Sequence, residues 1–320
     1  MTSEQVSFSI VICSYNRATS LAETLASIDA CLLPVGRLVE LVLIDNNSTD
    51  ATARICSDFA GVSRIPFRRV PETRQGVSFA RNRGIQEARG KVILFTDDDC
   101  RVNDHWLVTY AREFDENRVD CAFGRVYPDW RGTPPAWFSD ELNAAYALLD
   151  YGDQRFLVTD AAHEFFGANF AMRKDLLSEL GGFDVHLGRT EAKLLIGEET
   201  RVYHDLVRRG SKIAYNPSIE VRHVIEEGRK EKAYLLKYYR DSAESLVYIS
   251  LLGPPQRRVL GIPFFLAKKF AVFYAKFVPR LLSLAVRLDG AGLFALRLNE
   301  RRNWRMILLF LRTRFKRLDQ

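Results

Sequence analysis

KVILFTDDD (residues 91–99) is a short apolar run that ends in three consecutive aspartates. Residues 92–95 are too few for an ordinary helix and are flanked by polar residues, which is typical of a strand buried on both faces. Asp97, Asp98 and Asp99 follow where this strand must end. Because ligands in parallel α/β sheets bind beyond the carboxyl ends of the strands, the segment predicts a strand and a candidate binding site together.

Two similar apolar runs precede it, FSIVIC at residues 8–13 and LVLI at residues 41–44. Each ends in polar residues and each is followed by a helical pattern. Ser20 and Glu23 fit a capping box for the first helix, and residues 48–50 supply capping residues for a second helix that ends near Phe59. Strands that alternate with helices predict an α/β fold with a mostly parallel sheet.

The composition is that of a packed globular protein, with 47% hydrophobic and 27% charged residues in a chain of 320. This length suffices for one large domain or for a domain with an appendage. The five cysteines are odd in number and contain no C-x-x-C pair, which disfavours a disulfide framework or a structural zinc site and favours a reducing compartment. We expect no secretory signal, because the first seven residues are polar and acidic.

Charge divides the chain unevenly. Residues 229–320 carry 20 Lys and Arg against 6 Asp and Glu, whereas residues 1–228 carry a net negative charge. We therefore expect a domain over residues 1–228 and a basic helical region over residues 229–320, with irregular connecting structure over residues 125–165. In residues 257–318 basic residues alternate with Phe, Leu and Trp, and no apolar stretch reaches the length of a membrane-spanning helix.

This basic pattern fits helices that lie in the interface of an anionic membrane. The alternative is a helical appendage that packs on the first domain, with Lys and Arg on its solvated face. Nucleic-acid binding is disfavoured, because the remainder of the chain is acidic and no nucleic-acid-binding module is recognisable.

Six sequence blocks resemble the inverting glycosyltransferases of family 2, which have the GT-A fold. The blocks occur in the family's order over roughly residues 7–225, and they read SIVICSYNR, LVLIDNNSTDAT, QGVSFARNRGIQEARGKVILFTDDD, GANFAMRKDLLSELGGFD, GEET and NPSIEVRH. The resemblance, to members of the bacterial envelope-polysaccharide type, implies a Rossmann-like, mostly parallel central sheet flanked by helices, with the C-terminal helical region as an appendage.

The triple aspartate is the candidate metal site. Closely packed carboxylates repel one another, and a bound dication removes that penalty. Hard cations such as Mg²⁺ or Mn²⁺ prefer oxygen ligands and commonly bridge carboxylates to phosphates. The resemblance implies that Asp99 ligates the metal, that Asp97 lies near the ribose and the metal's waters, and that His223 completes the metal shell. A solvated acidic turn and a structural histidine are the alternatives.

The resemblance also implies a donor-binding set at the strand ends. This set comprises Ser14, Tyr15, Arg17, Asp45, Gly76, Arg81, Asp97 and Asp98. Asp45 would bond the base or ribose, with a helix-capping loop as the alternative. Arg81 would approach the donor phosphates, because a guanidinium donates paired hydrogen bonds, with a surface helix charge as the alternative.

The acidic pair Glu198-Glu199 is the candidate catalytic base. An inverting transfer needs one carboxylate that takes a proton from the acceptor hydroxyl. The resemblance favours Glu199, where the family usually carries Asp, and leaves the choice between Glu198 and Glu199 open; a helix N-terminal charge is the alternative. The predicted acceptor side comprises Asn169, Gly182, Asp184 and Trp137.

The sequence thus predicts a metal-assisted inverting glycosyltransferase with a nucleotide-diphosphate donor, UDP-sugar by default. Its acceptor would be a hydroxyl of a lipid-linked or polysaccharide molecule. The expected location is the cytoplasm, peripherally on the inner face of the cell membrane. A nucleotidyltransferase acting on sugar phosphates and a non-catalytic membrane-associated scaffold are the alternatives; SYNRATS lacks the glycine-rich phosphate loop of the former.

Overall fold

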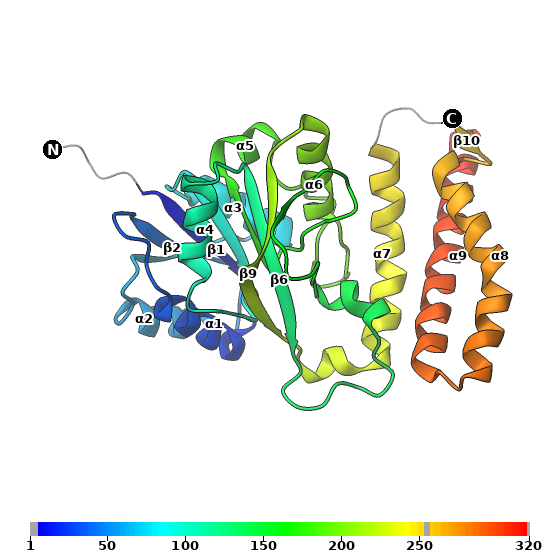
Figure 1. Ribbon diagram of the computed structural model, residues 1–320, viewed down its shortest axis with the longest axis horizontal. Helices are drawn as coiled ribbons and strands as arrows, with labels where there is room; N and C mark the ends of the chain where they lie inside the picture. Colours follow the sequence, from blue (N-terminus) through cyan, green and yellow to red (C-terminus); the bar gives the residue numbers. More distant parts are fainter. Residues whose placement is uncertain (1–5, 253–256, 319–320) are drawn as a thin grey trace. The chain divides into compact units, whose positions relative to one another are not determined.

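The computed structural model describes residues 6–252 and 257–318, with side chains up to Arg312 (Figure 1). The described chain forms two compact units. The first comprises the chain up to Gly132 together with Tyr146–Glu191 and Glu198–Ile225, and the second comprises Thr133–Ala145, Ala192–Gly197 and the chain from Glu226. The predicted division after residue 228 stays a prediction.

A nine-stranded sheet forms the centre of the first unit among the described residues. Across the sheet the order is β3 (Phe67–Pro71), β2 (Val39–Asp45), β1 (Phe8–Ser14), β4 (Val92–Asp97), β8 (Asn169–Arg173), β6 (Cys121–Asp129), β9 (Ile213–Val224) and β5 (Cys100–Val102), and β7 (Phe156–Leu157) pairs with β9. Strands β3, β2, β1 and β4 are mutually parallel. The predicted α/β, GT-A-type fold with a mostly parallel sheet is confirmed.

The register brings the predicted strand ends to one edge of the sheet. Ser14 pairs with Asp45 in the parallel β1–β2 ladder, and Cys13 pairs with Asp97 in the parallel β1–β4 ladder. The apolar residues between them, such as Val11 and Leu43, are fully buried. Because these strands are parallel and paired in this register, their carboxyl ends lie at the same edge of the sheet.

Helices flank this sheet (Figure 1). They are α1 (Ala18–Ala30), α2 (Thr52–Ala60), α3 (Val77–Glu87), α4 (Trp106–Asp115), α5 (Lys174–Glu179) and α6 (Glu198–Arg209). The predicted capping box at Ser20 and Glu23 is wrong, because α1 begins at Ala18 and Ser20 lies inside it. The backbone N–H of Ala18 instead donates to Asp50 Oδ2 at 3.0 Å, so the cap comes from a distant loop.

The segment predicted to be irregular contains more structure than expected. Strand β6 continues to Asp129, because its C-terminal part pairs in parallel with β9 beyond a bulge at Gly124. A Cβ at Gly124 would lie 1.9 Å from the carbonyl oxygen of Ile219, so only glycine allows this close approach of the strands. A 3₁₀ helix, η1 (Asp140–Tyr146), and β7 complete the segment.

The second unit is mainly helical, as predicted for the C-terminal region. It contains η2 (Glu227–Lys230), α7 (Lys232–Leu252), the short hairpin β10 (Arg258–Val259) and β11 (Ile262–Pro263), α8 (Phe264–Val286) and α9 (Gly290–Leu318). Helix α9 packs against both α7 and α8 (Figure 1). Among the described residues, none of the helices combines the length and the apolar character needed to cross a membrane.

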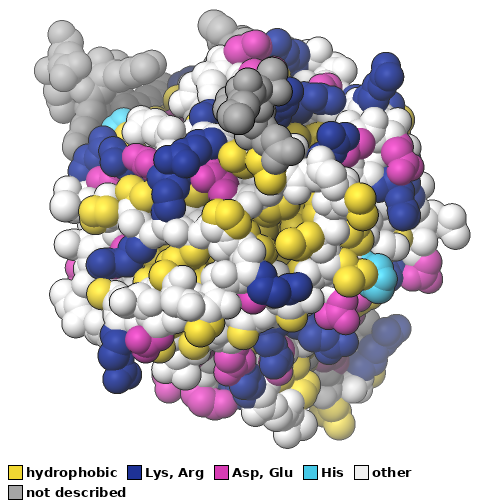
Figure 2. Space-filling model, turned by 90° about the vertical axis from the view of Figure 1, so that its left-hand side faces the viewer, with side chains coloured by type: hydrophobic (Ala, Val, Ile, Leu, Met, Phe, Trp, Pro, Cys, Tyr) yellow, Lys and Arg dark blue, Asp and Glu magenta, His cyan; other side chains and the backbone are white. Residues whose placement is uncertain are grey.

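The surface of the first unit carries charges of both signs. On the side that lies at the left of Figure 1, Lys and Arg side chains are interspersed with Asp and Glu, and hydrophobic side chains show between them (Figure 2). All five cysteines belong to this unit and are free thiols.

Candidate active site

The ends of β1 and β4 are joined by side-chain contacts. The Ser14 hydroxyl donates to Asp98 Oδ2 at 2.7 Å, and the Arg17 guanidinium forms an ion pair with Asp99. Tyr15, between them in sequence, is half-buried. Burial, together with the Asp99 charge and against the attraction of Arg17, raises the pKa of Asp98 to about 7. The predicted residues of these two loops therefore form one polar cluster.

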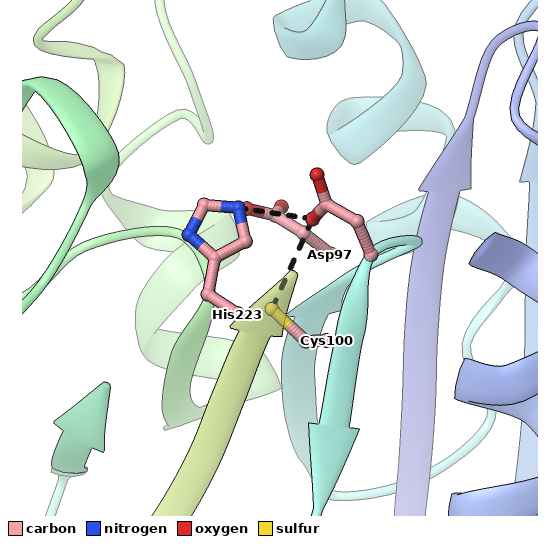
Figure 3. A group of neighbouring side chains, drawn as sticks. Asp97, Cys100 and His223 are labelled. Carbon is pink, nitrogen blue, oxygen red and sulfur yellow. Dashed lines mark hydrogen bonds and ion pairs between the residues drawn. The ribbon is translucent and has the colours of Figure 1, made fainter. Parts of the chain in front are cut away.

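A second group of side chains lies where β4, β5 and β9 meet (Figure 3). Asp97, Asp99, Cys100 and His223 each offer a ligand atom, and these four atoms lie within 4.8 Å of one another. The antiparallel pairing of β5 with β9 places Cys100 directly opposite His223. The three predicted metal ligands thus converge, although His223 is more than a hundred residues from the aspartates in sequence.

The surroundings of His223 orient its imidazole ring in a way that is compatible with metal binding. Its Nδ1 lies 2.7 Å from the carbonyl oxygen of Tyr146, which can only accept, so we assign the ring proton to Nδ1. Nε2 then directs a lone pair toward Asp99 Oδ1, 3.1 Å away. Two electron-rich atoms at this distance repel unless a proton or a cation lies between them. A backbone carbonyl that orients a histidine in this way is typical of metal sites, so the residues fit a bound divalent cation.

Cys100 is the member of this group that sequence reasoning missed. Its thiol is buried and lies 4.0 Å from Asp99 Oδ1. Burial first, and then the nearby Asp99 charge, raise the pKa of the thiol well above its usual value, so the thiol stays protonated and neutral. Two carboxylates and one neutral imidazole remain as the ligand set, and their oxygen and nitrogen atoms suit Mg²⁺ or Mn²⁺. The signal available was the cysteine that directly follows the triple aspartate.

Arg81 connects the metal side to the acidic pair. Its guanidinium lies 2.8 Å from Glu198, 3.0 Å from Glu199 and 3.4 Å from Asp97. Arg81 is only 4% exposed, so the alternative of a surface helix charge is wrong. Burial opposes its charge, but the three carboxylates outweigh burial and raise its pKa above the ordinary value. The guanidinium is engaged by protein carboxylates, and its predicted contact with the donor phosphates stays a prediction.

Glu198 and Glu199 occupy the first turn of α6 and differ in their surroundings. The side chain of Glu198 is 6% exposed and that of Glu199 is 15% exposed. Burial first, and then the neighbouring Glu199 charge, raise the pKa of Glu198 to about 8, so Glu198 holds a proton at neutral pH. Glu199 Oε1 accepts a hydrogen bond from the backbone N–H of Gly167 at 2.9 Å. A group that already holds its proton cannot act as a base, which favours Glu199.

Two glycines make room for this acidic pair, and neither was predicted. A Cβ at Gly167 would lie 1.9 Å from Arg81 Nη2 and 2.3 Å from Glu199 Oε1. Gly188 has a φ of +87°, and a Cβ there would lie 3.2 Å from the carboxyl carbon of Glu198. Gly167 belongs to the block GANFAMR, where glycine itself was the available signal.

Asp45 makes more contacts within the protein than the sequence predicted. Its Oδ1 accepts the backbone N–H of Ser48 at 3.0 Å, and its Oδ2 pairs with Arg69 at distances of 2.5 and 2.9 Å. The Ser48 contact closes the loop after β2 and does not cap α2, which begins at Thr52. A nucleotide contact would have to share the carboxylate with Arg69. Arg69 comes from β3, a strand that sequence reasoning did not predict.

The residue after Asp45 organises the start of α3. Asn46 Oδ1 accepts the backbone N–H of Gly76 at 2.8 Å, while its amide group donates to the carbonyls of Glu72 and Arg74. Gly76 has a φ of +141°, which favours glycine. The predicted donor contact of Gly76 stays a prediction.

The four predicted acceptor-side residues have different surroundings. Asn169 is 1% exposed, and its amide bonds Trp106, Tyr110 and the carbonyls of Arg125 and Ile219, so no hydrogen-bonding atom is left for an acceptor. Gly182 has a φ of +71° in the loop after α5, and Asp184 forms an ion pair with Arg201 of α6. Trp137 belongs to the second unit, where its ring meets that of Phe294 edge-on.

Known proteins resemble this chain in sequence and in fold. It is 27% identical to the glucosyl-dolichyl phosphate glucuronosyltransferase of Haloferax volcanii over 236 residues, which cover 71% of this chain and 72% of that protein. A mannosyltransferase from Pyrobaculum calidifontis, solved with GDP-Man and Mn²⁺, superposes with a TM-score of 0.60 at 17% identity over 95% of this chain and 88% of that chain. GalNAc-T7, solved with UDP, GalNAc and Mn²⁺, superposes with a TM-score of 0.53 at 20% identity over 74% of this chain but only 47% of that chain.

These likenesses agree with the GT-A-type fold described above and place the chain in the class of proteins with that fold. The family model named Glycosyl transferase family 2 matches residues 9–181, more than half of the chain. The protein belongs to this family of glycosyltransferases.

Proposed function

We propose that this enzyme transfers a sugar, with inversion and metal assistance, from a nucleotide-diphosphate donor to a hydroxyl of a lipid-linked or polysaccharide acceptor. One observation carries the proposal. Arg81 lies 3.4 Å from Asp97, on the metal side, and 3.0 Å from Glu199, the proposed base. The groups needed to hold a donor diphosphate and to deprotonate an acceptor are therefore within reach of one guanidinium.

Asp97, Asp99 and His223 would hold the divalent cation, Mg²⁺ or Mn²⁺. The cation, when bound, stabilises the negative charge on the departing diphosphate. The Mn²⁺ in two structural neighbours supports this assignment. Arg17, which pairs with Asp99, is the proposed protein contact to the diphosphate itself, because its guanidinium is about a quarter exposed and carries a fork of donors.

Glu199 is the proposed general base. Gly167 and Arg81 both donate to its Oε1, which orients the carboxylate and leaves Oε2 to accept the proton of the acceptor hydroxyl. Attack from the side opposite the departing diphosphate inverts the anomeric centre, and no covalent enzyme intermediate forms. Glu198, holding its own proton, is the proposed supporting residue that keeps Arg81 in place.

The donor and the acceptor are proposed by class. UDP is our default nucleotide and GDP the alternative, since one structural neighbour holds UDP and another GDP-Man. A lipid-linked acceptor is supported by the name of the glucuronosyltransferase relative, which includes glucosyl-dolichyl phosphate. Ser14, Tyr15, Asp45, Gly76 and Asp98 remain the proposed donor side.

Peripheral attachment to the inner face of the cell membrane is the proposed location. Many large apolar side chains of α8, α9 and the preceding hairpin are exposed: Val259, Leu260, Phe264, Phe265, Val272, Val278, Leu282, Val286, Leu288, Trp304 and Leu308. Anionic vesicles should pellet the wild type better than the Phe264→Ser, Phe265→Ser variant. The control variant, Val35→Ser, Val62→Ser, changes exposed residues of the first unit, and equal pelleting of both variants and wild type would count against membrane contact.

The central test is donor hydrolysis with Mn²⁺. We expect Asp99→Asn to lose at least about a hundredfold in turnover of UDP-sugars and GDP-sugars, because one ligand and its charge are removed. Asp104→Asn, at an exposed residue near the same turn, is the matched control. Undiminished turnover in Asp99→Asn would refute the metal assignment.

A further inference from the structure

The second unit contains a cavity of about 520 Å³ between α7 and α9, within the size range of small-molecule sites. Its lining includes five basic side chains, Lys237 and Arg240 from α7 and Arg301, Arg302 and Arg305 from α9. Lys237 and Arg240 are three positions apart on α7, and on α9 Arg305 is four positions from Arg301 and three from Arg302. The basic residues of each helix therefore lie on one side of it, and they line the same cavity. The proposed chemistry of sugar transfer uses none of them.

The positive charge of this cavity is only partly compensated. Arg240 pairs with Asp241 at 2.9 Å, and Arg305 pairs with Glu244 at 2.6 Å. In the part of the chain that the structure describes, the other three lining cations have no carboxylate within 4 Å; they are Lys237, Arg301 and Arg302. Like charges that converge in one cavity repel, and an anion between them removes that cost.

Arg302 is held in place without being neutralised. Its guanidinium lies 4.9 Å from the ring centre of Tyr239 and donates to Asn299 Oδ1 at 2.7 Å. The Nε–H groups of Arg302 and Arg305 are buried and have no acceptor among the described residues. A fixed arginine fork with donors to spare is suited to a phosphate group, which accepts several charge-assisted hydrogen bonds at once.

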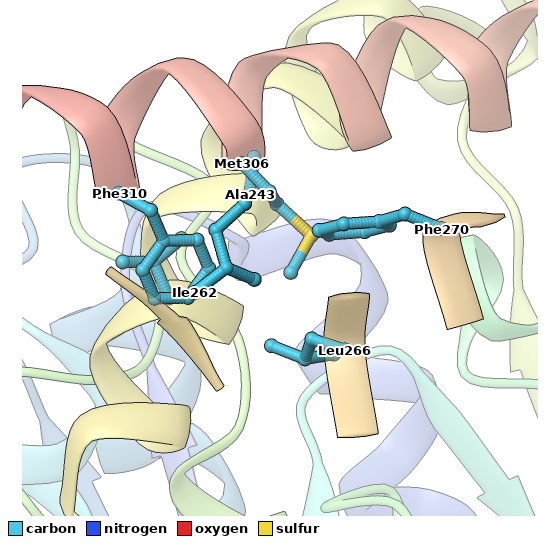
Figure 4. Packing of buried hydrophobic residues seen from close by; sticks show 7 residues of the cluster. Ala243, Ile262, Leu266, Phe270, Met306 and Phe310 are labelled. Carbon is cyan, nitrogen blue, oxygen red and sulfur yellow. The ribbon is translucent and has the colours of Figure 1, made fainter. Parts of the chain in front are cut away.

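The helices that form the cavity are fixed by a shared apolar core (Figure 4). Ala243 of α7, Phe270 of α8 and Phe310 of α9 pack together there with Ile262, Leu266 and Met306. The helices that carry the basic side chains are therefore held in place before a ligand binds, which lowers the entropic cost of binding.

We propose that this cavity, termed here the α7–α9 basic pocket, binds a phosphate group with at least two negative charges, a phosphomonoester or a diphosphate. Such a group can come from a lipid headgroup or from a soluble molecule. Phosphate binding in this pocket would be a property additional to the proposed sugar transfer. It does not depend on which donor the enzyme uses.

The test uses the full chain in EDTA, so that no metal-dependent donor binding contributes. Binding of inorganic pyrophosphate is measured by titration calorimetry for the wild type and for Lys237→Gln, Arg301→Gln. Neither residue forms an ion pair with another described residue, so the fold should be retained, which the thermal midpoint checks. The matched control is Lys269→Gln, Lys276→Gln, which removes the same charge from exposed positions of α8 outside the pocket.

We expect the pocket variant to bind pyrophosphate at least about tenfold more weakly and the control to stay within about twofold, since each charge-assisted hydrogen bond is worth roughly a factor of ten. Vesicles with phosphatidic acid are compared with phosphatidylserine vesicles of equal surface charge. A preference for phosphatidic acid that the pocket variant lacks identifies a lipid source, and pyrophosphate binding without that preference identifies a soluble source.

Equal weakening by both variants would overturn the proposal, because general charge attraction would then explain the binding. Wild-type protein that binds neither pyrophosphate nor phosphatidic acid selectively would overturn it as well. Donor hydrolysis with Mn²⁺ is recorded in parallel; its absence would contradict the proposed function and would leave this result unaffected.

Discussion

Glu198 and Glu199 both accept a hydrogen bond from Nη1 of Arg81, at 2.8 and 3.0 Å, and Glu199 Oε1 also accepts one from the backbone N–H of Gly167. The shared guanidinium holds two consecutive carboxyl groups at one place. Burial and then the adjacent Glu199 charge raise the pKa of Glu198 to about 8, so Glu198 keeps its proton at neutral pH. Two neighbouring acids can therefore have different roles.

The first prediction concerns the catalytic base. Glu199→Gln should lower kcat of sugar transfer by a factor of about 10²–10⁴, because no carboxylate then remains at this position to accept the proton of the acceptor hydroxyl. Donor affinity should stay within about twofold. Glu198→Gln resembles the protonated residue already present and should cost less than about tenfold. Steady-state transfer kinetics and donor titration measure both, and a larger loss in Glu198→Gln would reverse the assignment.

The second prediction concerns stability and pH. The folded protein keeps a proton on Glu198 up to about pH 8, whereas the unfolded chain releases it near the ordinary value of 4.5. The folded state therefore binds more protons in this interval, and the free energy of unfolding falls as pH rises, by at most about 1.4 kcal/mol per pH unit.

Glu198→Gln should remove this contribution. The free energy of unfolding of the variant, relative to that of the wild type, should therefore increase from pH 5.5 to 8.5. Urea unfolding at the two pH values measures it. Glu116→Gln, at a mostly exposed glutamate, should leave the difference unchanged with pH. A difference for Glu198→Gln that is also independent of pH would contradict the raised pKa.

The third prediction concerns the space at Gly167. Gly167→Ala places a methyl group in contact with Arg81 and Glu199, so we expect transfer to fall at least about a hundredfold. Overpacking should also lower the free energy of unfolding by about 1–3 kcal/mol. Gly61→Ala, where the nearest atom to the new Cβ is 3.5 Å away, is the control and should change both by little. Transfer kinetics and urea unfolding report the two effects; a fully active Gly167→Ala would show that the acidic pair tolerates displacement.

The fourth prediction concerns metal affinity. His223→Gln should weaken Mn²⁺ binding about 10- to 100-fold, because the ring held by the Tyr146 carbonyl is lost as a ligand. Calorimetry or the electron paramagnetic resonance of free Mn²⁺ measures this without any substrate. His105→Gln, at an exposed histidine, should bind like the wild type. Unchanged affinity in His223→Gln would leave the histidine with a structural role only.

The candidate site could be predicted in part, and the successes and failures have physical causes. The aspartates at residues 97–99 were placed at a strand end because an apolar strand followed by charges is a local pattern. For Arg81 the sequence left a phosphate ligand and a surface charge open, and it did not predict the buried pairing with carboxylates. Its carboxylate partner Glu198 is 117 positions away in sequence, and no local pattern reports such a pairing.

The prediction of the α1 cap was wrong for the same reason, since the residue that caps the helix, Asp50, is 32 positions from Ala18. The strand β5, of three residues, is too short for a periodic signal, yet it places Cys100 beside the proposed metal ligands. Gly167 showed only that some constraint exists; the reason, two charged groups within van der Waals distance, depends on atoms from other elements.

The chain alone was sufficient for the alternation of strands and helices, the acidic strand ends, the family and the basic C-terminal region, because hydrophobic periodicity and motif spacing are local properties of the sequence. Only the folded structure decided which acid keeps its proton, which nitrogen of His223 faces the carboxylates and where Lys237 and Arg301 converge. Those properties depend on burial and on distances between segments remote in sequence, and both arise only when the chain packs.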